Sequence, residues 1–543
     1  MLFHEFATLA DSLSRTGGKL DKSAQIGAYL ATLRDEDLLL ATRYLAGAPF
    51  ALHDERVLNV GMAQIRDVVV QVSGITPAAW DELMVTHGDP GDAAVAAFAD
   101  VLPTTPTLTL HAVQTALEQL GVARGPKEKT PLLIELVRNA TLPEARYLLK
   151  LLSGELRIGV REGQVEDAIH RAFGQPLALV RRANMLLGDI GETALRARDG
   201  TLDVAQMRLF HPLKSMLASP IEEPSEIRRS IAEEFFVEDK YDGIRAQAHR
   251  TAERVELFSR TLDNITHRFP EVVAALREVP HDVILDGEIL AVRDGVILPF
   301  AALQKRLGRK TVGAALLAET PVVYVVYDVL FLDGAVLLEQ PLSERRAALD
   351  SLPWIAPLQP SLLARESSLA VIDAHFAAAR ARGNEGLMIK DPRSAYTPGR
   401  RGREWLKVKR ALATLDVVVT AAEVGHGKRR TVLSDYTFAV RRSADDPTLL
   451  NIGKAYSGLT DAEIAELTEW FKAHTIQRFG RVHLVEPQIV LEVAFDAVQA
   501  SPRHKSGFAL RFPRIVRLRP DKPASEIDTL EAVRALAGSA ATT

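Results

Sequence analysis

The spacing of the apolar residues changes once along this chain, near residue 205, and this change limits the possible folds more than any other feature. Before it, apolar residues recur every three or four positions, as in residues 35–45, where the pattern stops at Gly47. Such spacing places apolar side chains on one face of a helix. From about residue 212, apolar runs typical of β-strands appear instead. The clearest of these runs are 283–292, 321–332 and 415–424.

A chain of 543 residues is long enough for three or four domains at roughly 100–200 residues each. We predict an all-α domain over residues 1–205, a mixed α/β domain over 206–412 and a β-rich domain over 413–543. The middle section also holds shorter helical stretches such as 369–380, and the last section has a clear helix near 461–474. The fold class is therefore multidomain.

The composition excludes several kinds of chemistry. The chain has no cysteine, which removes disulfides, thiol nucleophiles and cysteine-based zinc sites. Its 14 histidines include no His-Glu-x-x-His pair, so nothing supports a zinc hydrolase. A catalytic metal is therefore expected to be a hard cation held by carboxylates.

The net charge and the absence of long apolar runs bear on partners and location. A net charge of −4 argues mildly against a nucleic-acid binder, so such binding has to come from local basic patches such as 503–522. We find no apolar run of about 20 residues and no signal-peptide pattern at the N-terminus. We therefore expect a cytoplasmic protein that does not enter a membrane.

The strongest local signal for catalysis is Lys240, which is followed by Asp242, Gly243 and Arg245. An apolar run precedes it, so a strand leading into a tight glycine turn would present the lysine at the strand end. A lysine is nucleophilic only when neutral, and neighbouring positive charge such as that of Arg245 lowers a lysine pKa. In isolation, the motif fits a salt-bridged lysine in a surface turn equally well.

Further acids and lysines lie inside apolar runs. Glu288 and Glu385 are placed where an unpaired charge would be costly unless it binds a metal or a counter-ion. Lys407 and Lys409 fall on one face of a predicted strand, where two like charges favour an anionic partner such as phosphate. Singly, each is more often a solvated or ion-paired residue. Together they suit phosphoryl transfer.

A glycine-containing loop follows a predicted helix in the N-terminal section. The helix begins at the capping box formed by Thr141 and Glu144. The loop spans residues 153–161 and carries Arg157 and Arg161, so its backbone N–H groups and charges suit phosphate contacts. Considered alone, the loop is better explained as an ordinary interhelical turn with solvated arginines.

Taken in order, these segments resemble the motif set of the covalent nucleotidyltransferases, which comprise DNA ligases, RNA ligases and capping enzymes. No P-loop and no kinase-type glycine-rich loop competes with this assignment. The matching segments are 240–245, 258–260, 285–288, 326–328, 385–390, 405–409 and 511–522.

The finer resemblance is to ATP-dependent DNA ligases of the archaeal, eukaryotic and some bacterial types. It rests on residues 211–218, on the Ser-Gly-x-Leu-Arg-x-Gly segment within 145–163, and on the form of the last motif, and it is weakest over 1–130. It implies a helical DNA-binding domain, an adenylation domain of the nucleotidyltransferase, ATP-grasp-like fold and an OB-fold domain. It also implies ATP and Mg²⁺ as cofactors, and nicked double-stranded DNA as the partner of a nucleoid-associated enzyme. Since no exposed apolar stripe is obvious in the sequence, we expect a monomer.

The resemblance also implies a role for individual residues. Lys240 would carry AMP, Glu238 would recognise adenine and Tyr327 would stack on it, although the family often has Phe at that position. Glu288 and Glu385 would serve the ribose and Mg²⁺. The remaining contacts to the nucleotide or its phosphates would come from Arg245, Arg260, Arg401, Lys407, Lys409, Arg514, Arg517 and Lys522. Contacts to DNA would come from Ser153, Gly154, Arg157 and Arg161.

Three rival interpretations remain. An RNA ligase or guanylyltransferase shares the lysine motif, but the N-terminal segment and the last motif argue against it. A non-catalytic DNA-binding scaffold would be expected to lose Lys240, Glu288 or Lys407, and all three are present. NAD-dependent ligases usually carry a cysteine-based zinc module, which this chain lacks.

Pro520 interrupts the last motif but keeps its flanking charges, and no sliding-clamp motif is identifiable. We also predict a hinge near 401–413.

Overall fold

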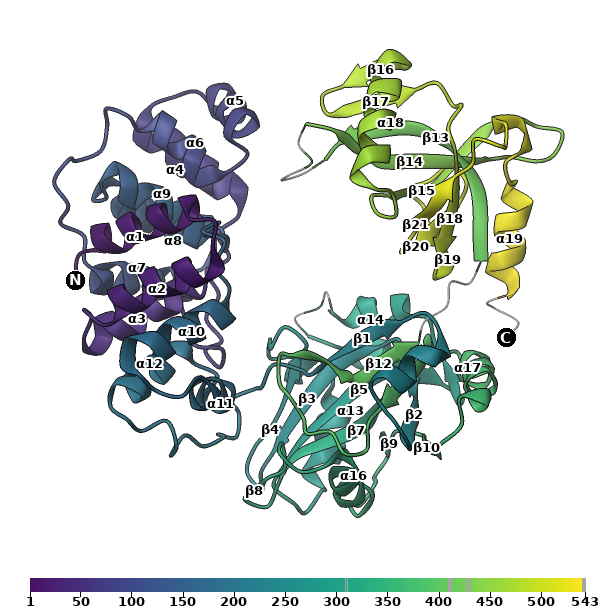
Figure 1. The fold of residues 1–543 in the computed structure, drawn as a ribbon, viewed down its shortest axis with the longest axis horizontal. Coiled ribbons are helices and arrows are strands. Elements are labelled where there is room, and N and C mark those ends of the chain that lie inside the picture. Colours follow the sequence, from purple (N-terminus) through teal and green to yellow (C-terminus); the bar gives the residue numbers. More distant parts are fainter. Residues whose placement is uncertain (308, 310, 409–412, 426–428, 430, 540–543) are drawn as a thin grey trace.

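The computed structural model has three bodies that follow one another along the chain (Figure 1). A helical N-terminal domain, a central α/β domain and a strand-rich C-terminal domain lie around a common centre. The resemblance implies that the central domain is an adenylation domain, and we use that name for it. The order and type of the three domains confirm the predicted fold class. The structure describes residues 1–307, 309, 311–408, 413–425, 429 and 431–539. Residues 409–412, in the predicted hinge, lie outside this part of the chain.

The N-terminal domain packs its helices around one continuous core. The predicted helix 35–45 is α3 (Asp35–Leu45), and the capping box opens α9 (Leu142–Leu152), where the Glu144 carboxylate accepts from the Thr141 backbone N–H at 2.7 Å. Buried residues of α1, α3, α7, α9 and α10 all belong to this core. The other helices are α1 (Phe3–Arg15), α2 (Lys19–Leu30), α4 (Met62–Ser73), α5 (Pro77–His87), α6 (Pro90–Ala97), α7 (Leu110–Val122), α8 (Gly125–Arg138), α10 (Glu162–Phe173), α11 (Leu177–Leu187) and α12 (Ile190–Arg198).

The adenylation domain consists of two sheets with helices packed against them. One sheet has the strand order β1-β12-β11-β2-β10, and the other has β4-β3-β5-β7-β8 with β6 and β9 attached. The predicted runs 283–292 and 321–332 are β5 and β7. The strands are β1 (Leu217–Ile221), β2 (Phe235–Lys240), β3 (Ile244–Arg250), β4 (Val255–Ser259), β5 (Val283–Arg293), β6 (Val296–Ile297), β7 (Val322–Leu332), β8 (Ala335–Val336), β9 (Leu358–Pro360), β10 (Leu363–Glu366), β11 (Gly386–Lys390) and β12 (Arg401–Val408).

Two apolar cores hold these sheets, and a third cluster lies where they meet. Helix α17 (Ile372–Ala381) covers the first sheet, and α13 (Pro270–Arg277) and α16 (Leu342–Asp350) cover the second. The third cluster includes Met216, Tyr396 and Trp405 and combines residues of both sheets with the segment that enters the domain. Two short helices, α14 (Phe300–Leu307) and α15 (Ala314–Glu319), complete the domain.

The C-terminal domain is a curled sheet that shares its apolar core with two helices. Strands run in the order β15-β14-β13-β18-β21, and the Ile515 N–H donates to the Ser457 carbonyl at 2.9 Å, which joins the two ends of this order. This is the barrel expected of an OB-fold. The elements are β13 (Ala413–Val424), β14 (Leu433–Arg441), β15 (Leu449–Ala455), α18 (Asp461–Ala473), β16 (Thr475–Phe479), β17 (Val482–Val485), β18 (Val490–Phe495), β19 (Ala497–Ala500), β20 (Phe508–Arg511), β21 (Arg514–Leu518) and α19 (Leu530–Ser539).

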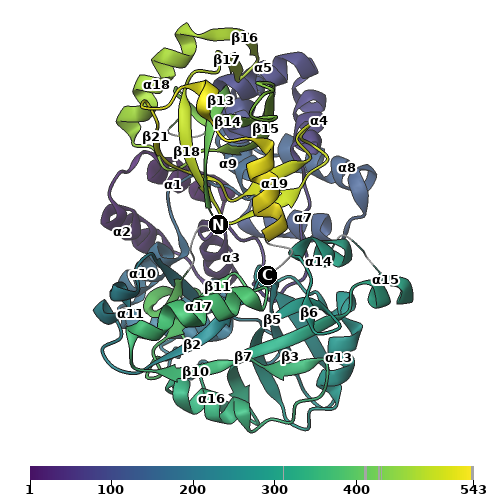
Figure 2. The same ribbon diagram turned by 90° about the vertical axis from the view of Figure 1, so that its right-hand side faces the viewer.

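Ion pairs and hydrogen bonds join the domains. Arg182 of the helical domain pairs with Glu339 at 2.8 Å, and Lys214 pairs with Glu162 across the same boundary. The turned view shows the C-terminal domain over the edge of the adenylation domain that carries β11 (Figure 2). No helix in the described part of the chain is long and apolar enough to cross a membrane.

Candidate active site

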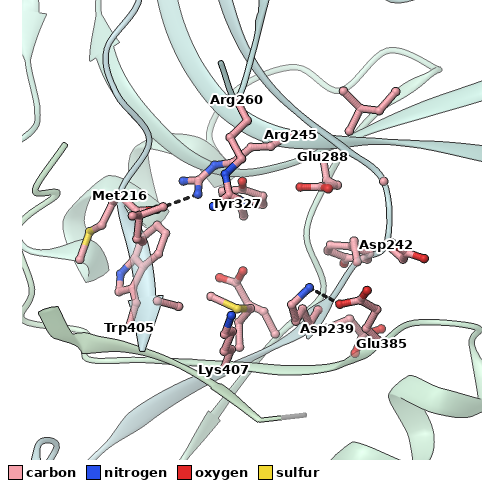
Figure 3. A pocket seen from close by; sticks show the side chains of 18 of the residues that line it. Met216, Asp239, Asp242, Arg245, Arg260, Glu288, Tyr327, Glu385, Trp405 and Lys407 are labelled. Atoms are coloured by element: carbon pink, nitrogen blue, oxygen red, sulfur yellow. Dashed lines mark hydrogen bonds and ion pairs between the residues drawn. The ribbon is translucent and has the colours of Figure 1, made fainter. Parts of the chain in front are cut away.

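A cavity of about 520 Å³ lies between the two sheets of the adenylation domain. Strands β2, β11 and β12 contribute to one wall, and β3, β5 and β7 contribute to the other. Figure 3 shows Arg245 and Glu288 on one side of this cavity and Lys407 on the opposite side. The predicted side chains that line it are Glu238, Lys240, Arg245, Arg260, Glu288, Tyr327, Glu385, Arg401 and Lys407.

Lys240 is the last residue of β2, as the strand-and-turn pattern predicts. Its ammonium forms an ion pair with Glu385, and the Glu385 N–H donates to the Lys240 carbonyl at 2.8 Å. The turn that follows requires a glycine, because a Cβ on Gly243 would lie 2.3 Å from the Ile289 carbonyl oxygen. The backbone therefore holds the lysine beside a carboxylate at the open end of the cavity.

Glu238 lies two residues before Lys240 and points from the same strand into the interior. One carboxylate oxygen, Oε2, pairs with Lys390 at 2.8 Å, and both side chains are almost completely buried. The other oxygen, Oε1, is buried and has no hydrogen-bond partner among the described residues. A buried acceptor left without a partner is costly, so a ligand that donates a hydrogen bond would stabilise it.

A buried carboxylate, Asp286, organises the opposite wall. It accepts two hydrogen bonds from Arg245, at 3.0 and 2.6 Å, one from Tyr396 at 2.6 Å and one from Tyr327 at 3.3 Å. Burial alone would lower the pKa of Arg245, but the charge of Asp286 raises that pKa well above its usual value. Arg245 also donates to the Met216 carbonyl at 2.7 Å, so the segment entering the domain is fixed to the cavity wall.

Glu288 and Glu385 are the acids expected to hold a metal. Burial raises the pKa of Glu288 to about 7, although the nearby Arg245 and Lys240 oppose this. The described residues include no group of three or more acids or histidines able to hold a cation by themselves. Mg²⁺ commonly binds one or two carboxylates together with substrate phosphates and water. Two acids in a cavity that is also lined by cations fit that pattern.

Three of the other predicted cations lie around the same cavity. Arg260 follows β4, and Arg401 and Lys407 lie on β12. Lys409 falls outside the described residues. Three cations around one cavity supply the positive charge that a triphosphate would need.

The last motif contributes different residues from those predicted. Arg511 and Phe512 line the cavity, and Arg511 pairs with Asp242 through two hydrogen bonds of 2.5 and 3.0 Å. The predicted residues lie outside the cavity lining. Arg517 pairs with Glu492 at 2.7 Å, Lys522 pairs with Asp416 at 2.7 Å, and Arg514 begins β21.

The predicted DNA-binding segment forms a loop between α9 and α10, away from this cavity. Ser153 is the C-cap of α9, and Gly154 and Arg157 adopt positive φ angles of 76° and 53°. Arg157 pairs with Asp89 at 3.3 Å and Glu155 at 3.0 Å. Arg161 lines a second cavity, of about 810 Å³, between the helical and adenylation domains.

Sequence reasoning did not single out Arg511, Lys390, Asp286 or Tyr396 as site residues. Signals existed for two of them. Asp286 lies in the same apolar run as Glu288, and Lys390 ends the run that begins after Glu385. Arg511 opens the last motif, but the sequence does not indicate which of its several cations faces the cavity. Nothing in the sequence marks Tyr396.

Comparisons with known proteins cover the whole chain. Family models described as "DNA ligase N terminus", "ATP dependent DNA ligase domain" and "ATP dependent DNA ligase C terminal region" match residues 2–170, 215–409 and 429–522. A "Probable DNA ligase" of Koribacter versatilis is 51% identical, with 97% of this chain and 95% of that protein covered. A "DNA ligase" of Methanoculleus marisnigri is 39% identical, with 98% and 97% covered. The solved structure "Pmar-Lig_Pre." shares the fold, with a TM-score of 0.61 at 17% identity, and 95% of this chain and 99% of that one are covered.

Proposed function

This chain belongs to the ATP-dependent DNA ligases, and we propose that its Lys240 carries AMP from ATP to the 5′-phosphate of a nick in duplex DNA. The observation that carries this proposal is the position of Lys240, which ends a buried strand beside Glu385 in a cavity lined by cations. A lysine amine suits such a transfer because covalent storage of AMP divides one difficult displacement into easier ones.

In the first step, the Lys240 amine attacks the α-phosphorus of ATP. A phosphorus–nitrogen bond forms, the bond to the β-phosphate oxygen breaks, and pyrophosphate leaves. The amine must first lose its proton, and Glu385 is the carboxylate in contact with it. Arg260, Arg401, Lys407 and Lys409 would stabilise the negative charge that gathers around the phosphorus.

Two further displacements would complete the reaction. A 5′-phosphate oxygen of the nick attacks the lysyl-bound AMP, which releases Lys240 and leaves a DNA-adenylate. The neighbouring 3′-hydroxyl then attacks the 5′-phosphate, forms the phosphodiester and releases AMP. Each step gathers negative charge at one phosphorus, so the same cations would serve all three.

The base, the ribose and the metal would be held by the surrounding walls. The unpaired Oε1 of Glu238 would accept from the adenine amino group, and Tyr327 would stack on the ring. Glu288 and Glu385 would hold Mg²⁺, which would neutralise phosphate charge when bound. Arg514, Arg517 and Lys522 would reach the leaving pyrophosphate only if the C-terminal domain moved, because they lie outside the cavity lining in this arrangement.

The helical domain would hold the DNA duplex through its backbone. Ser153, Gly154, Arg157 and Arg161 would contact phosphates, which position a protein without reading sequence. Arg161 supports this because it lines the cavity between two domains, where Arg181, Arg182, Arg400 and Arg401 also lie. We propose that a monomer acts in this way, and that its work on chromosomal nicks keeps it at the nucleoid.

The test is to incubate the protein with α-labelled ATP and Mg²⁺, separate it on a denaturing gel and then add nicked duplex DNA. Label should remain on the wild-type protein and leave as the nick is sealed. Lys240→Ala should take no label. Lys305→Ala is a matched control, because Lys305 is also ion-paired to a glutamate of the adenylation domain, at 2.6 Å, but lies on the surface.

Other results would identify the rival functions. Label that nicked DNA cannot discharge, but that a nick in an RNA strand can, would indicate an RNA-directed enzyme. No label on wild-type protein that has been freed of bound AMP would contradict the transfer altogether and favour a non-catalytic scaffold.

A further inference from the structure

The ion pair between Lys390 and Glu238 is almost completely buried. The Lys390 and Glu238 side chains are 1% and 2% exposed, and their charged atoms lie 2.8 Å apart. Removing two charges from water costs free energy that their mutual attraction offsets poorly. Apolar residues of similar volume therefore often replace such a pair without loss of stability. Fold stability alone therefore does not explain why this pair is present.

The sheet register fixes where the Lys390 ammonium lies. Lys390 is opposite Trp405 on β12 and opposite Phe236 on β2, two pairs along from the Met388–Glu238 pair. Its ammonium lies 4.3 Å from the Trp405 ring centroid and 4.7 Å from that of Tyr327. Such contacts attract a cation to the face of an aromatic ring. Two aromatic rings and one carboxylate therefore hold the ammonium in a single position.

In this pair, one carboxylate oxygen of Glu238 is hydrogen-bonded and the other is not. Oε2 is held by Lys390, and Oε1 has no partner among the described residues. An ion pair with the Lys390 ammonium requires the ionised carboxylate, and an ionised carboxylate only accepts hydrogen bonds. Its available oxygen therefore selects for a donor and disfavours an acceptor.

We propose that Lys390 is a specificity-determining positioning residue that keeps Glu238 in the acceptor form and thereby restricts the cavity to 6-aminopurine nucleotides. The inference rests on the proposed role of Glu238 toward the base. Adenine presents an amino group at position 6, whereas guanine and hypoxanthine present a carbonyl oxygen there. A carbonyl oxygen facing the Glu238 carboxylate would leave two acceptors in contact without a proton between them.

Without Lys390, the carboxyl group would lose this restriction. An isolated buried carboxylate tends to take up a proton, and a protonated carboxyl group can donate to a carbonyl oxygen. Lys390→Met removes the charge but keeps a flexible apolar chain of similar length against Tyr327 and Trp405. Discrimination between 6-amino and 6-carbonyl purines should therefore fall, even where the fold is kept.

The experiment measures nucleotide binding rather than turnover. All proteins carry Lys240→Ala so that no adenylate forms, and dissociation constants are measured for ATP, ITP and purine riboside triphosphate, which has hydrogen at position 6. The parent should bind ATP at least about tenfold more tightly than either analogue, because a site built for a donor rejects ligands that lack it. Lys390→Met should bring both ratios close to one, mainly by weakening ATP. Lys454→Met is the matched control. It breaks an ion pair with Glu423 on the surface of the C-terminal domain and should leave both ratios unchanged.

A second variant covers the case in which Lys390→Met does not fold. Glu238→Gln combined with Lys390→Met contains no unpaired buried charge, and thermal unfolding would verify its fold. The Gln amide can donate, so ITP should gain on ATP in this protein. Equal weakening of all three nucleotides, with unchanged ratios in both variants, would overturn the proposal, as would a parent that does not prefer ATP. Failure of the wild-type protein to label Lys240 would instead count against the transfer chemistry. The ratios of dissociation constants could still be measured, because they do not depend on labelling.

Discussion

The cavity walls and the last motif both present cations to the same space, but they hold them differently. In the walls, Arg245 and Lys390 are fixed by buried carboxylates of the same domain, Asp286 and Glu238. From the last motif, Arg511 reaches the cavity and is held by Asp242, a residue of another domain. The walls are therefore organised before any substrate arrives, whereas the contribution of the last motif depends on how two domains are placed.

This difference assigns the two sets to different parts of the reaction. Groups fixed in advance stabilise developing charge without further reorganisation, and they can serve every step. A cation delivered by another domain is present only while the domains are in contact, and domain movement commonly separates the steps of a reaction. Substitutions in the walls should therefore impair all steps, and substitutions in the last motif should impair only some of them.

The largest expected effect tests the wall beside the nucleophile. Glu385→Gln removes the carboxylate that pairs with Lys240 and one of the two acids proposed to hold Mg²⁺. We expect a loss of at least about 10²-fold in both lysine labelling and nick sealing, typical of a lost electrostatic contact in an active site. Both rates would be measured under single-turnover conditions.

Glu319→Gln is the matched control, because Glu319 is an exposed acid of the adenylation domain paired with Lys305. An equal loss in this control, or an undiminished rate in Glu385→Gln, would contradict the assigned role of Glu385.

A smaller effect concerns pH. Burial raises the pKa of Glu288 to about 7, so its carboxyl group is protonated below that pH and cannot bind a cation. Lysine labelling should therefore rise as the pH increases through about 7, and Glu288→Gln should lose this part of the profile. A profile of unchanged shape in the variant would contradict the role of Glu288.

The same group also links stability to pH. Its pKa in the folded protein is above the ordinary value of 4.5, so the unfolded chain releases this proton more readily. The contribution of protonated Glu288 to the free energy of unfolding is fully present below pH 4.5 and is lost as the pH rises to about 7. Relative to Glu288→Gln, the nucleotide-free protein should lose unfolding free energy across this window, as chemical denaturation would measure.

The smallest expected effect comes from Tyr327→Phe. The ring that would stack on adenine stays, and only the 3.3 Å hydrogen bond to Asp286 is lost. Such a bond contributes about 1 kcal/mol, so ATP affinity should fall by no more than about fivefold. Tyr327→Ala is the comparison and should cost much more. Similar losses in the two variants would mean that the hydroxyl group, rather than the ring, holds the nucleotide.

Much of the architecture was predictable because it follows from local patterns. The helix 35–45, the capping box at Thr141 and the strands β5 and β7 all arise from the spacing of apolar residues and from capping chemistry, which a sequence shows directly. The position of Lys240 at a strand end followed from the apolar run before it and the glycine after it. The family resemblance supplied the OB-fold of the last domain, and strand patterns alone do not identify it.

What the sequence did not indicate depends on pairing across the fold. Tyr396 is 110 positions from Asp286, and Lys390 is 152 positions from Glu238, so neither contact leaves a local signal. The choice of Arg511, rather than Arg514 or Arg517, as the residue that faces the cavity depends on how β20, which pairs with β19, and β21 are oriented in the C-terminal domain. Which of these arginines faces the cavity also depends on the relative placement of two domains, and no periodicity in the chain encodes that placement.

The comparison between the walls and the last motif is tested most directly by measuring two half-reactions of Arg511→Ala under single-turnover conditions. One is lysine labelling with ATP, and the other is sealing of a nick that already carries AMP on its 5′-phosphate. Arg519→Ala is the control from the same motif, since Arg519 pairs with Asp416 outside the cavity. We predict that Arg511→Ala slows labelling about 10²-fold while sealing stays within about threefold of wild type. Equal losses in both half-reactions would contradict the account, because Arg511 would then belong to the permanent wall of the site.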